Sequence, residues 1–422
     1  MPSFNKYTLD NGLVVLLKEV HSAPVISWWV MYRVGSRNEP TGKTGISHWV
    51  EHMMFKGTEK FPAGVLDKSI DRFGGQWNAF TSTDHTMYYE TLPANRIDLA
   101  LEAEANRMTN AIFDPEETES ERSVIISERQ GSENSPMFWL NEQMRGASFH
   151  VHGYHHEIIG DMADLHSITR DDLYNHYRHH YMPSNAVTVA VGAFDSDDML
   201  QKIKQHYGNI PSSAAPDLFS RLEPEQQGER RVVVERPGHT AFLKVAYRVP
   251  AATHDDWFKL EVLDSVLTGP GGGVDNKTSR LFQKLVKTEI AAGIGGGLNE
   301  SIDPYLYSLT VTLRDGRTLE EAEAALIEQI EHVVQGGITQ QELDKAKKQA
   351  RAAFAYGTES VTNQAYWLAQ SAALHDYEWN EKYVSRLEAV TVDDIHEAAQ
   401  RYFVPKQRIT GWLVPTGMEE NE

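Results

Sequence analysis

The sequence predicts two similar α+β domains in tandem. Three observations support this: the chain repeats itself, the same order of strands and helices is expected in each half, and a polar segment separates the halves. A chain of 422 residues is too long for one ordinary core and sufficient for two domains of about 200 residues each. We expect domains at residues 1–211 and 229–422. The linker between them, residues 212–228, is rich in Ser, Ala, Pro, Glu and Gln.

The internal repeat is clearest near the end of each half. Thr169-x-Asp171-Asp172 returns 222 positions later as Thr391-x-Asp393-Asp394. In both places a Thr N-cap followed by acidic residues predicts the start of a helix. The same offset aligns the apolar segments 187–191 and 409–413, which predict equivalent strands.

Composition limits the kind of partner and the kind of metal site. The chain has 40 basic and 60 acidic side chains, and its net charge of −20 argues against nucleic acid as the main partner. The acidic excess would suit basic peptides, although a solvated acidic surface explains it more simply. The sequence has no cysteine, which excludes disulfides and thiolate ligands, so a metal would have to be held by His, Asp or Glu.

The apolar segments and the N-terminal residues bear on location. The longest apolar segments, residues 25–31 and 186–194, have strand length, so we expect no membrane span. Residues 1–6 lack the basic and then apolar pattern of a secretory signal, which favours a cytoplasmic location. A periplasmic location is expected if a signal segment was removed.

A candidate metal motif, H-x-x-E-H, occupies residues 48–52 in a segment that is expected to be helical. Residues four apart share a helical face, so His48 and His52 can direct their imidazoles to one point, with Glu51 beside them. Zinc hydrolysis uses this arrangement: three protein ligands leave the fourth position to water, and a nearby carboxylate takes the proton of that water. The alternative is two histidines of an amphipathic helix without a metal.

A third ligand would separate these interpretations, and residues 115–130 offer two carboxylates. This Glu-rich segment predicts a helix on which Glu121 and Glu128 lie two turns apart, on one face. Glu128 follows an apolar run at residues 124–126, where an unpaired carboxylate would be costly and a metal would satisfy it. Glu121 could hydrogen-bond a ligand imidazole, or it could be an exposed member of an acidic helix.

These residues resemble the pitrilysin family of zinc peptidases, whose motif is the inverted zincin H-x-x-E-H followed by a distant Glu. The resemblance extends over nearly the whole chain. It includes residues 7–13, residues 74–79 and the segment Ser279-Arg280-Leu281-Phe282-Gln283 of the second half. The chain is most similar in pattern to the catalytic subunit of mitochondrial-processing-peptidase-like bacterial heterodimers.

The resemblance implies two homologous domains, each an antiparallel sheet packed against helices, and two such units paired around a closed chamber. It implies one Zn²⁺ held by His48, His52 and Glu128, with Glu51 as general base and Glu121 supporting the site. The substrate would be an extended peptide. It would pair with an edge strand that includes Asn78, Ala79 and Phe80.

The second half departs from the family pattern. The positions that repeat the zinc motif are residues 263–267, Leu-Asp-Ser-Val-Leu, so no second metal site is expected. The Arg and Tyr that stabilise the oxyanion in self-sufficient members align with Val286 and Gly293, neither of which has a side-chain donor. We therefore expect a heterodimer with a homologous subunit that supplies Arg and Tyr. A homodimer in which Tyr305 or Tyr307 substitutes is the alternative.

Two further patterns suggest sites less strongly. The Gly-rich loop at residues 268–273 lacks the Lys and the preceding parallel strand of a nucleotide loop, so we interpret it as a flexible loop near substrate. The cluster His150, His152, His155 and His156 has no acidic partner at helical spacing, and we interpret it as structural or substrate-lining.

Three functions remain open at this point. The first is a zinc endopeptidase acting on short unfolded peptides. The second is a structural or assembly subunit on the same fold, and the third is a protein that binds peptides without cleaving them. The intact motif favours the first, because neither of the others needs Glu51.

Overall fold

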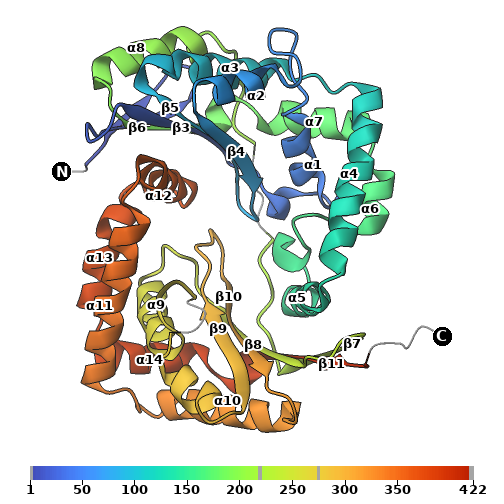
Figure 1. The fold of residues 1–422 in the computed structure, drawn as a ribbon, viewed down its shortest axis with the longest axis vertical. Coiled ribbons are helices and arrows are strands. Elements are labelled where there is room, and N and C mark those ends of the chain that lie inside the picture. Colours follow the sequence, from blue (N-terminus) through green and yellow to red (C-terminus); the bar gives the residue numbers. More distant parts are fainter. Residues whose placement is uncertain (1–2, 217–220, 273–275, 418–422) are drawn as a thin grey trace. The chain divides into compact units, whose positions relative to one another are not determined.

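The protein forms two compact units, each built around one sheet, as the computed structural model shows (Figure 1). The structure describes residues 3–216, 221–272 and 276–417. Unit 1 consists of residues 1–130, 156–221 and 357–381, and unit 2 of residues 131–155, 222–356 and 382–422. The α+β fold class with two sheets packed against helices is confirmed. The expected division at residues 211 and 229 stays a prediction, and residues 217–220 of the expected linker lie outside the described residues.

The sheet of unit 1 has six strands and is mixed, with one parallel pair. In sheet order the strands are β1 (Asn5–Thr8), β2 (Val14–Glu19), β6 (Ala186–Gly192), β3 (Val25–Tyr32), β5 (Thr86–Pro93) and β4 (Gln76–Thr81). Only β2 and β6 run parallel; the other pairs are antiparallel. β4 is therefore an edge strand, as expected for residues 78–80.

Unit 2 repeats this topology without the first strand. In sheet order its strands are β7 (Arg230–Arg236), β11 (Arg408–Pro415), β8 (Phe242–Val249), β10 (Tyr305–Leu313) and β9 (Ala291–Gly297). The one parallel pair, β7 with β11, corresponds to β2 with β6. The predicted repeat is thus present in the strand order as well as in the sequence.

The helix starts of the repeat also agree. Thr169 begins α7 (Arg170–His180) and Thr391 begins α14 (Val392–Tyr402). Each Thr accepts a hydrogen bond from the Asp three residues on, and that Asp caps the Thr in return. Equivalent helices of the two halves therefore begin with the same pair of capping residues, a Thr and an Asp.

Both faces of the unit 1 sheet are buried, which explains the long apolar runs of its central strands. On β3, Trp28, Val30 and Tyr32 face a core formed with α1 (Ile46–Met53), α3 (Ile97–Asn110), α7 and α8 (Ser196–Tyr207). Trp29 and Met31 face the other side, where α12 (Val361–Ala373) covers the sheet. This alternation follows from the two-residue period of a strand.

Each sheet is covered on one face by a helix from the other half of the sequence. α12 belongs to unit 1, and α5 (Pro136–Ser148) belongs to unit 2, where it packs on β7 and β11. Gly411 on β11 permits this approach, because a Cβ there would come within 2.5 Å of the Met144 Sδ. Among the described residues, no helix has both the length and the apolar character that crossing a membrane requires.

The remaining helices complete the two units. They are α2 (Val65–Arg72), α4 (Pro115–Glu133), α6 (Met162–Ser167), α9 (Asp255–Leu267), α10 (Leu319–Val334), α11 (Gln340–Gly357) and α13 (Trp379–Ala389). α9 includes residues 263–267, which repeat the metal motif by position. Its Asp264 is buried, and Oδ1 accepts hydrogen bonds from Thr268 (2.8 Å) and Tyr307 (2.9 Å).

Asp264 makes the stability of the protein depend on pH. Burial raises the pKa of Asp264 to about 7, whereas an unfolded Asp titrates near about 4. The folded chain thus keeps this proton where the unfolded chain loses it, so stability falls as pH rises between about 4 and 7. Asp264→Asn keeps the acceptor Oδ1 but cannot ionise. We expect the loss of stability over this pH range to be about 1–3 kcal/mol smaller in this variant than in the wild type.

Thermal unfolding of the wild type and of Asp264→Asn at several pH values from 5 to 8 measures the difference. Asp315→Asn, at an exposed position after β10, is the matched control. The midpoint of the wild type should fall more steeply with pH than that of Asp264→Asn, and in parallel with that of the control. Equal slopes for all three proteins would show that Asp264 is ionised in the folded state.

Candidate metal centre

The motif His48-x-x-Glu51-His52 lies on α1, a helix of eight residues. Its apolar residues Trp49, Val50 and Met53 are buried in the core of unit 1, which orients the opposite side toward β4 and α4. Gly45 precedes the helix with φ of 88°, and a Cβ there would lie 2.4 Å from the carbonyl oxygen of Ile159. The start of α1 thus requires glycine, both for its left-handed backbone and for lack of space.

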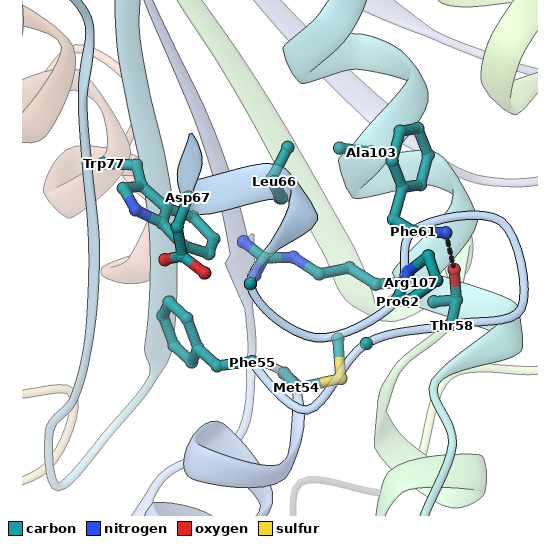
Figure 2. Close-up of a pocket in the computed structure, with 12 residues that line it drawn as sticks. Met54, Phe55, Thr58, Phe61, Pro62, Leu66, Asp67, Trp77, Ala103 and Arg107 are labelled. Carbon is teal, nitrogen blue, oxygen red and sulfur yellow. Dashed lines mark hydrogen bonds between the residues drawn. The ribbon is translucent and has the colours of Figure 1, made fainter. Parts of the chain in front are cut away.

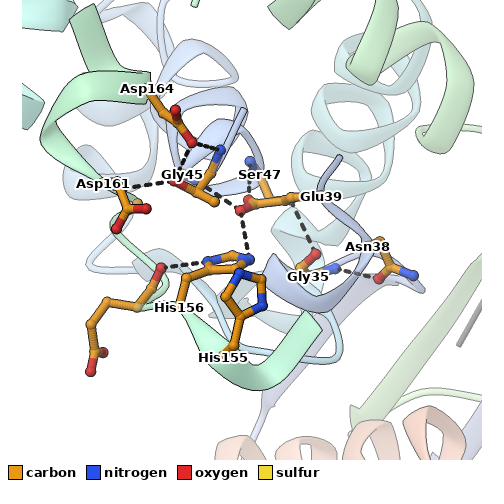
Figure 3. A network of polar contacts seen from close by, with 12 residues as sticks. Gly35, Asn38, Glu39, Gly45, Ser47, His155, His156, Asp161 and Asp164 are labelled. Carbon is orange, nitrogen blue, oxygen red and sulfur yellow. Dashed lines mark hydrogen bonds and ion pairs between the residues drawn. The ribbon is translucent and has the colours of Figure 1, made fainter. Parts of the chain in front are cut away.

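The first turn of α1 is capped by a carboxylate from outside the helix. The side chain of Glu39 is fully buried, and its oxygens accept hydrogen bonds from the backbone N–H groups of Gly45 and Ser47, both at 2.8 Å (Figure 3). The Nε2 of His156 lies 3.7 Å from the same carboxylate. Burial raises the pKa of Glu39 to about 8, against the hydrogen bonds from Ser47 and Gly45. Glu39 therefore fixes where α1 begins.

Three ligand atoms from α1 and α4 converge. The Nε2 atoms of His48 and His52 lie 3.9 and 3.7 Å from Oε2 of Glu128. All three atoms lie within 4.8 Å of one another, the one such group of three among the described residues. Glu128 is half-exposed, with 47% of its side chain accessible, so it reaches the group from the surface of α4. The three predicted ligands are thus brought together.

The donor set fits zinc. Metal–ligand distances of about 2.0–2.2 Å in a tetrahedron place ligand atoms about 3.3–3.6 Å apart, close to the distances from Glu128 to the two histidines. Burial and the neighbouring His52 lower the pKa of His48 to about 4, so its imidazole is neutral and can bind a cation. Two imidazoles and one carboxylate leave one tetrahedral position for water.

Glu51 lies beside the group and is held by β4. The hydroxyl of Thr81 donates to Oε2 of Glu51 at 2.6 Å. Glu51 is buried, and burial raises its pKa in spite of that hydrogen bond. Its carboxylate is therefore oriented by the edge strand and shielded from solvent.

Glu121 contacts His52 on the side of the ring that faces away from Glu128. Its Oε1 lies 2.8 Å from Nδ1 of His52, and its Oε2 lies 2.5 Å from Nζ of Lys56. Burial opposes ionisation of Glu121, but the hydrogen bonds from Lys56 and His52 outweigh it and lower the pKa. An ionised Glu121 accepts the Nδ1 proton of His52, which leaves Nε2 as the ligand atom.

His48 lacks this kind of support. Its Nδ1 is buried and has no hydrogen-bond partner among the described residues. The orientation of the His48 ring therefore depends on packing, including the edge contact with the His52 ring at 4.6 Å between centroids.

The position of α4 relative to α1 is set by contacts away from the ligands. The guanidinium of Arg122 lies 4.7 Å from the ring centre of Trp49 and donates to the carbonyl oxygen of Ile168. Arg129, next to Glu128, donates to the carbonyl oxygen of Gly160. These two arginines fix the position of α4 relative to α1, so that Glu128 reaches the histidines.

The predicted substrate strand has one open edge. β4 pairs with β5 and has no second strand partner among the described residues. The backbone N–H of Ser82, just after β4, donates to the carbonyl oxygen of His85 (2.8 Å) on the side of β5. Residues along a strand direct their backbone groups to alternate sides, so Ala79, three residues earlier, directs its N–H and C=O to the open edge. The N–H of Ala79 accordingly donates to the side-chain Oδ1 of Asn78 (2.9 Å). Phe80 instead packs on the opposite face, against Trp29 and Tyr366.

A pocket lies directly after α1 (Figure 2). Its walls include Met54 and Phe55, which follow the motif, Trp77 of β4, and the buried Arg107 of α3. The Arg107 guanidinium lies near the rings of Phe55 and Trp77, at 5.3 and 5.4 Å from their centroids. A pocket lined by aromatic rings, by Asp67 and by Arg107, which is ion-paired with Glu104, therefore adjoins both the metal helix and the edge strand.

The residues considered for oxyanion stabilisation lie in unit 2. Val286 ends a π-helical turn (Phe282–Val286), and Gly293 lies on β9. Tyr307, left open as a substitute, is buried and its hydroxyl donates to Asp264, so it does not point to a substrate. Tyr305 stacks on the ring of Phe149.

The histidine cluster at residues 150–156 and the Gly-rich loop at residues 268–273 form no further group of three metal ligands among the described residues. His152 is bonded to Asp303 (2.9 Å), and the Nδ1 of His156 lies 3.0 Å from the carbonyl of Glu157. In the Gly-rich loop, residues 270–272 form a short 3-10 turn, while Gly273 lies outside the described residues.

The fold and the His-His-Glu group together define a two-unit α+β protein with a candidate zinc centre, and comparison with known proteins gives the family. The chain matches "Insulinase (Peptidase family M16)" over residues 14–161 and "Peptidase M16 inactive domain" over residues 167–350. It belongs to peptidase family M16, which confirms the resemblance to the pitrilysin family.

Three relatives show the extent of the similarity. The zinc protease PqqE of Helicobacter pylori is 32% identical over 424 residues, covering 98% of this chain and 94% of that protein. The crystal structure of a protease from Helicobacter pylori has a TM-score of 0.93 and 31% identity, covering 98% of this chain and 100% of that one. The probable mitochondrial-processing peptidase subunit beta of Arabidopsis thaliana is 29% identical over 300 residues, 69% of this chain and 56% of that protein.

Sequence reasoning missed three residues that hold the site. Lys56 lies four residues after His52, a spacing that could have suggested a partner for Glu121. Thr81 and Glu39 carried no usable signal, because their partners Glu51 and the start of α1 are brought near only by the fold.

The support from Glu121 can be tested by metal affinity. We expect Glu121→Gln to weaken zinc binding about 10–100-fold, because the neutral amide no longer fixes and polarises the His52 ring. Competition with a chromophoric chelator measures the dissociation constant. Glu116→Gln, exposed on the first turn of α4, is the control and should bind zinc like the wild type. Unchanged affinity of Glu121→Gln would assign Glu121 to helix packing alone.

Proposed function

We propose that the chain is a zinc endopeptidase that hydrolyses short unfolded peptides. The observation that carries the proposal is the convergence of His48, His52 and Glu128 beside the buried Glu51. When bound at these ligands, zinc supplies a Lewis acid that activates water and polarises the scissile carbonyl. The names of the relatives as zinc proteases support this cofactor.

In this proposal Glu51 is the general base. Its carboxylate takes a proton from the attacking water, whose oxygen forms the new bond to the carbonyl carbon. Glu51 then returns the proton to the amide nitrogen as the C–N bond breaks, giving a carboxylic acid and an amine. Thr81 holds Oε2 of Glu51 throughout, which leaves the other oxygen to move the proton.

The edge strand β4 positions the substrate. An extended peptide adds to β4 as a further antiparallel or parallel strand, with hydrogen bonds to the backbone of Ala79. Asn78 must release the N–H of Ala79 to allow this. Main-chain pairing of this kind accepts many sequences, which suits a peptidase for short unfolded peptides.

The pocket of Figure 2 is placed to take one side chain of that peptide. It adjoins both α1 and β4, so a residue next to the scissile bond can enter it. Its walls combine the aromatic rings of Phe55 and Trp77 with the charged side chains of Asp67 and Arg107.

The oxyanion stabiliser is proposed to come from a partner. Val286 and Gly293 stand where self-sufficient family members have Arg and Tyr, and neither offers a side-chain donor. We propose a heterodimer with a homologous subunit that carries the pair and encloses a chamber with this chain. A homodimer is the alternative. The name of the Arabidopsis relative as a subunit is consistent with assembly.

A second candidate function is a catalytically weak peptide-binding or structural subunit of the same fold. The missing Arg and Tyr pair favours it. The retained Glu51 and its hydrogen bond from Thr81 favour the peptidase, because capture or assembly needs no buried general base.

The role of Glu51 is tested with a quenched fluorescent peptide in the presence of zinc. We expect Glu51→Gln to lower the turnover about 10²–10⁴-fold, because the amide cannot accept the proton, with zinc content unchanged. The exposed Glu116→Gln should cleave like the wild type. Full activity of Glu51→Gln at equal zinc content would refute the assignment.

The need for a partner is tested in the same assay with the chain alone and with a homologous M16 subunit that carries the Arg and Tyr. We expect cleavage in the mixture, and at least about tenfold less from the chain alone, because one or more oxyanion donors are absent. Equal activity of the isolated chain would retain the mechanism and refute the heterodimer.

A further inference from the structure

One carboxylate of the pocket in Figure 2 has no partner in the described chain. Asp67 lies on α2, is half-buried and lines the pocket. It forms no hydrogen bond or ion pair with any residue that the structure describes. A carboxylate that is partly removed from water and lacks a partner is costly, so Asp67 has an unmet need for a hydrogen-bond donor.

The same pocket is lined by a guanidinium whose donors are only partly used. Arg107 is 3% exposed, and its Nη2 donates to Glu104 and lies 3.4 Å from Oε1 of Glu90. Its Nε and Nη1 are buried and have no hydrogen-bond partner among the described residues. Buried donors are ordinarily paired, so these two indicate a place for an acceptor that the described chain does not supply.

The positive charge of Arg107 is balanced inside unit 1. Glu104 is buried and forms an ion pair with it. Burial and the neighbouring Glu104 raise the pKa of Glu90 well above its ordinary value, so Glu90 keeps its proton. Arg107 therefore offers the pocket hydrogen-bond donors, whereas the charge that no partner balances belongs to Asp67.

Asp67 and Arg107 line one pocket without forming an ion pair with each other. Figure 2 shows the guanidinium directed toward the side of the pocket where Asp67 and Trp77 lie. A ligand group between the two side chains would meet donors on one side and an acceptor on the other. Such a group has to accept and donate at the same time.

Aromatic rings form the walls beside these polar groups. The ring centroids of Phe55 and Trp77 lie 4.8 Å apart, with the rings tilted by 55°, and Phe61 lines the pocket as well. The empty space, partly open to solvent, is about 330 Å³. That is near the lower end of the range of about 300–1,000 Å³ usual for ligand sites, which suits a single flat side chain.

We propose that this pocket selects a tyrosine of the peptide substrate. The ring packs between Phe55 and Trp77, and the hydroxyl donates to Asp67 and accepts from Arg107. A hydroxyl combines one donor with acceptor lone pairs, whereas phenylalanine offers neither and lysine offers Arg107 no acceptor.

The inference rests on the proposed peptidase function. It adds Asp67 and Arg107 as the residues that determine which side chain is preferred beside the bond to be cleaved. The Arg107 side chain also holds Glu104 in the core, so Asp67 is the residue to vary.

The test measures binding, so that it does not depend on catalysis. The full-length chain with zinc and Glu51→Gln is titrated against three amidated twelve-residue peptides with a neutral fluorophore, followed by anisotropy. The peptides share an uncharged host without aromatic residues and differ at one central position, which is Tyr, Phe or Lys. We expect the Tyr peptide to bind about tenfold or more tightly than the Phe peptide, because a site built to hydrogen-bond a hydroxyl rejects the analogue that lacks it. The Lys peptide should bind less tightly than the Tyr peptide.

A variant assigns the preference to the pocket. Asp67→Ala, added to Glu51→Gln, should reduce the preference for Tyr over Phe to about threefold or less. Asp71→Ala has the same change in charge at an exposed position of α2 outside the pocket and should keep the preference. Circular dichroism confirms that each variant is folded.

The outcomes separate the two hypotheses. Equal affinity for the Tyr and Phe peptides, or a preference for Tyr that survives Asp67→Ala, would overturn the tyrosine pocket and leave the peptidase proposal standing. Tightest binding of the Lys peptide would overturn it as well, because Asp67 would then act by its charge alone. No binding of any peptide would overturn the proposed function together with the pocket.

Discussion

The buried carboxylate of Glu39 fixes the start of α1, and the arrangement of the candidate metal centre depends on it. A helix of eight residues has little stability of its own, and its N-cap residue, Gly45, has no side chain that could cap the first turn. Glu39 accepts two hydrogen bonds, from the backbone N–H groups of Gly45 and Ser47, and the hydroxyl of Ser47 donates to the carbonyl oxygen of Gly35 (3.2 Å). The cost of burying Glu39 is reduced because its raised pKa lets it hold a proton near neutral pH. His48 and His52 face α4 only because the helix begins at this point.

Side chains of α1 also connect this helix to α4 and to the edge strand β4. Trp49 contacts Arg122 of α4, His52 contacts Glu121, and Glu51 accepts a hydrogen bond from Thr81 of β4. The ligands, the base and the substrate strand are thus attached to one another by neighbouring side chains of α1. A change at any of these contacts displaces a group that acts in the proposed reaction, which is why positioning residues and acting residues are hard to separate in this site.

The sequence predicted the features that depend on local spacing. The repeat, the Thr caps at residues 169 and 391 and the pairing of His48 with His52 follow from fixed offsets that helices and strands impose. Glu128, the third candidate ligand, was predicted from the apolar run before it and from the family resemblance. The parallel pair in each sheet and the exchange of α5 and α12 were not predicted, because both depend on how distant segments return to a sheet. Thr81, Lys56 and Glu39 were missed for the same reason: each acts on a residue that only the fold brings near.

The two halves show how one topology supports different chemistry at equivalent positions. On α1 the side chains opposite the core are His48, Glu51 and His52, whereas the equivalent positions of α9 are Leu263, Val266 and Leu267, all buried. One buried polar group of α9, Asp264, is turned inward and accepts hydrogen bonds from Thr268 and Tyr307. The equivalent edge strands differ in the same way, since β4 carries Asn78 and Thr81 while β9 is largely glycine and alanine.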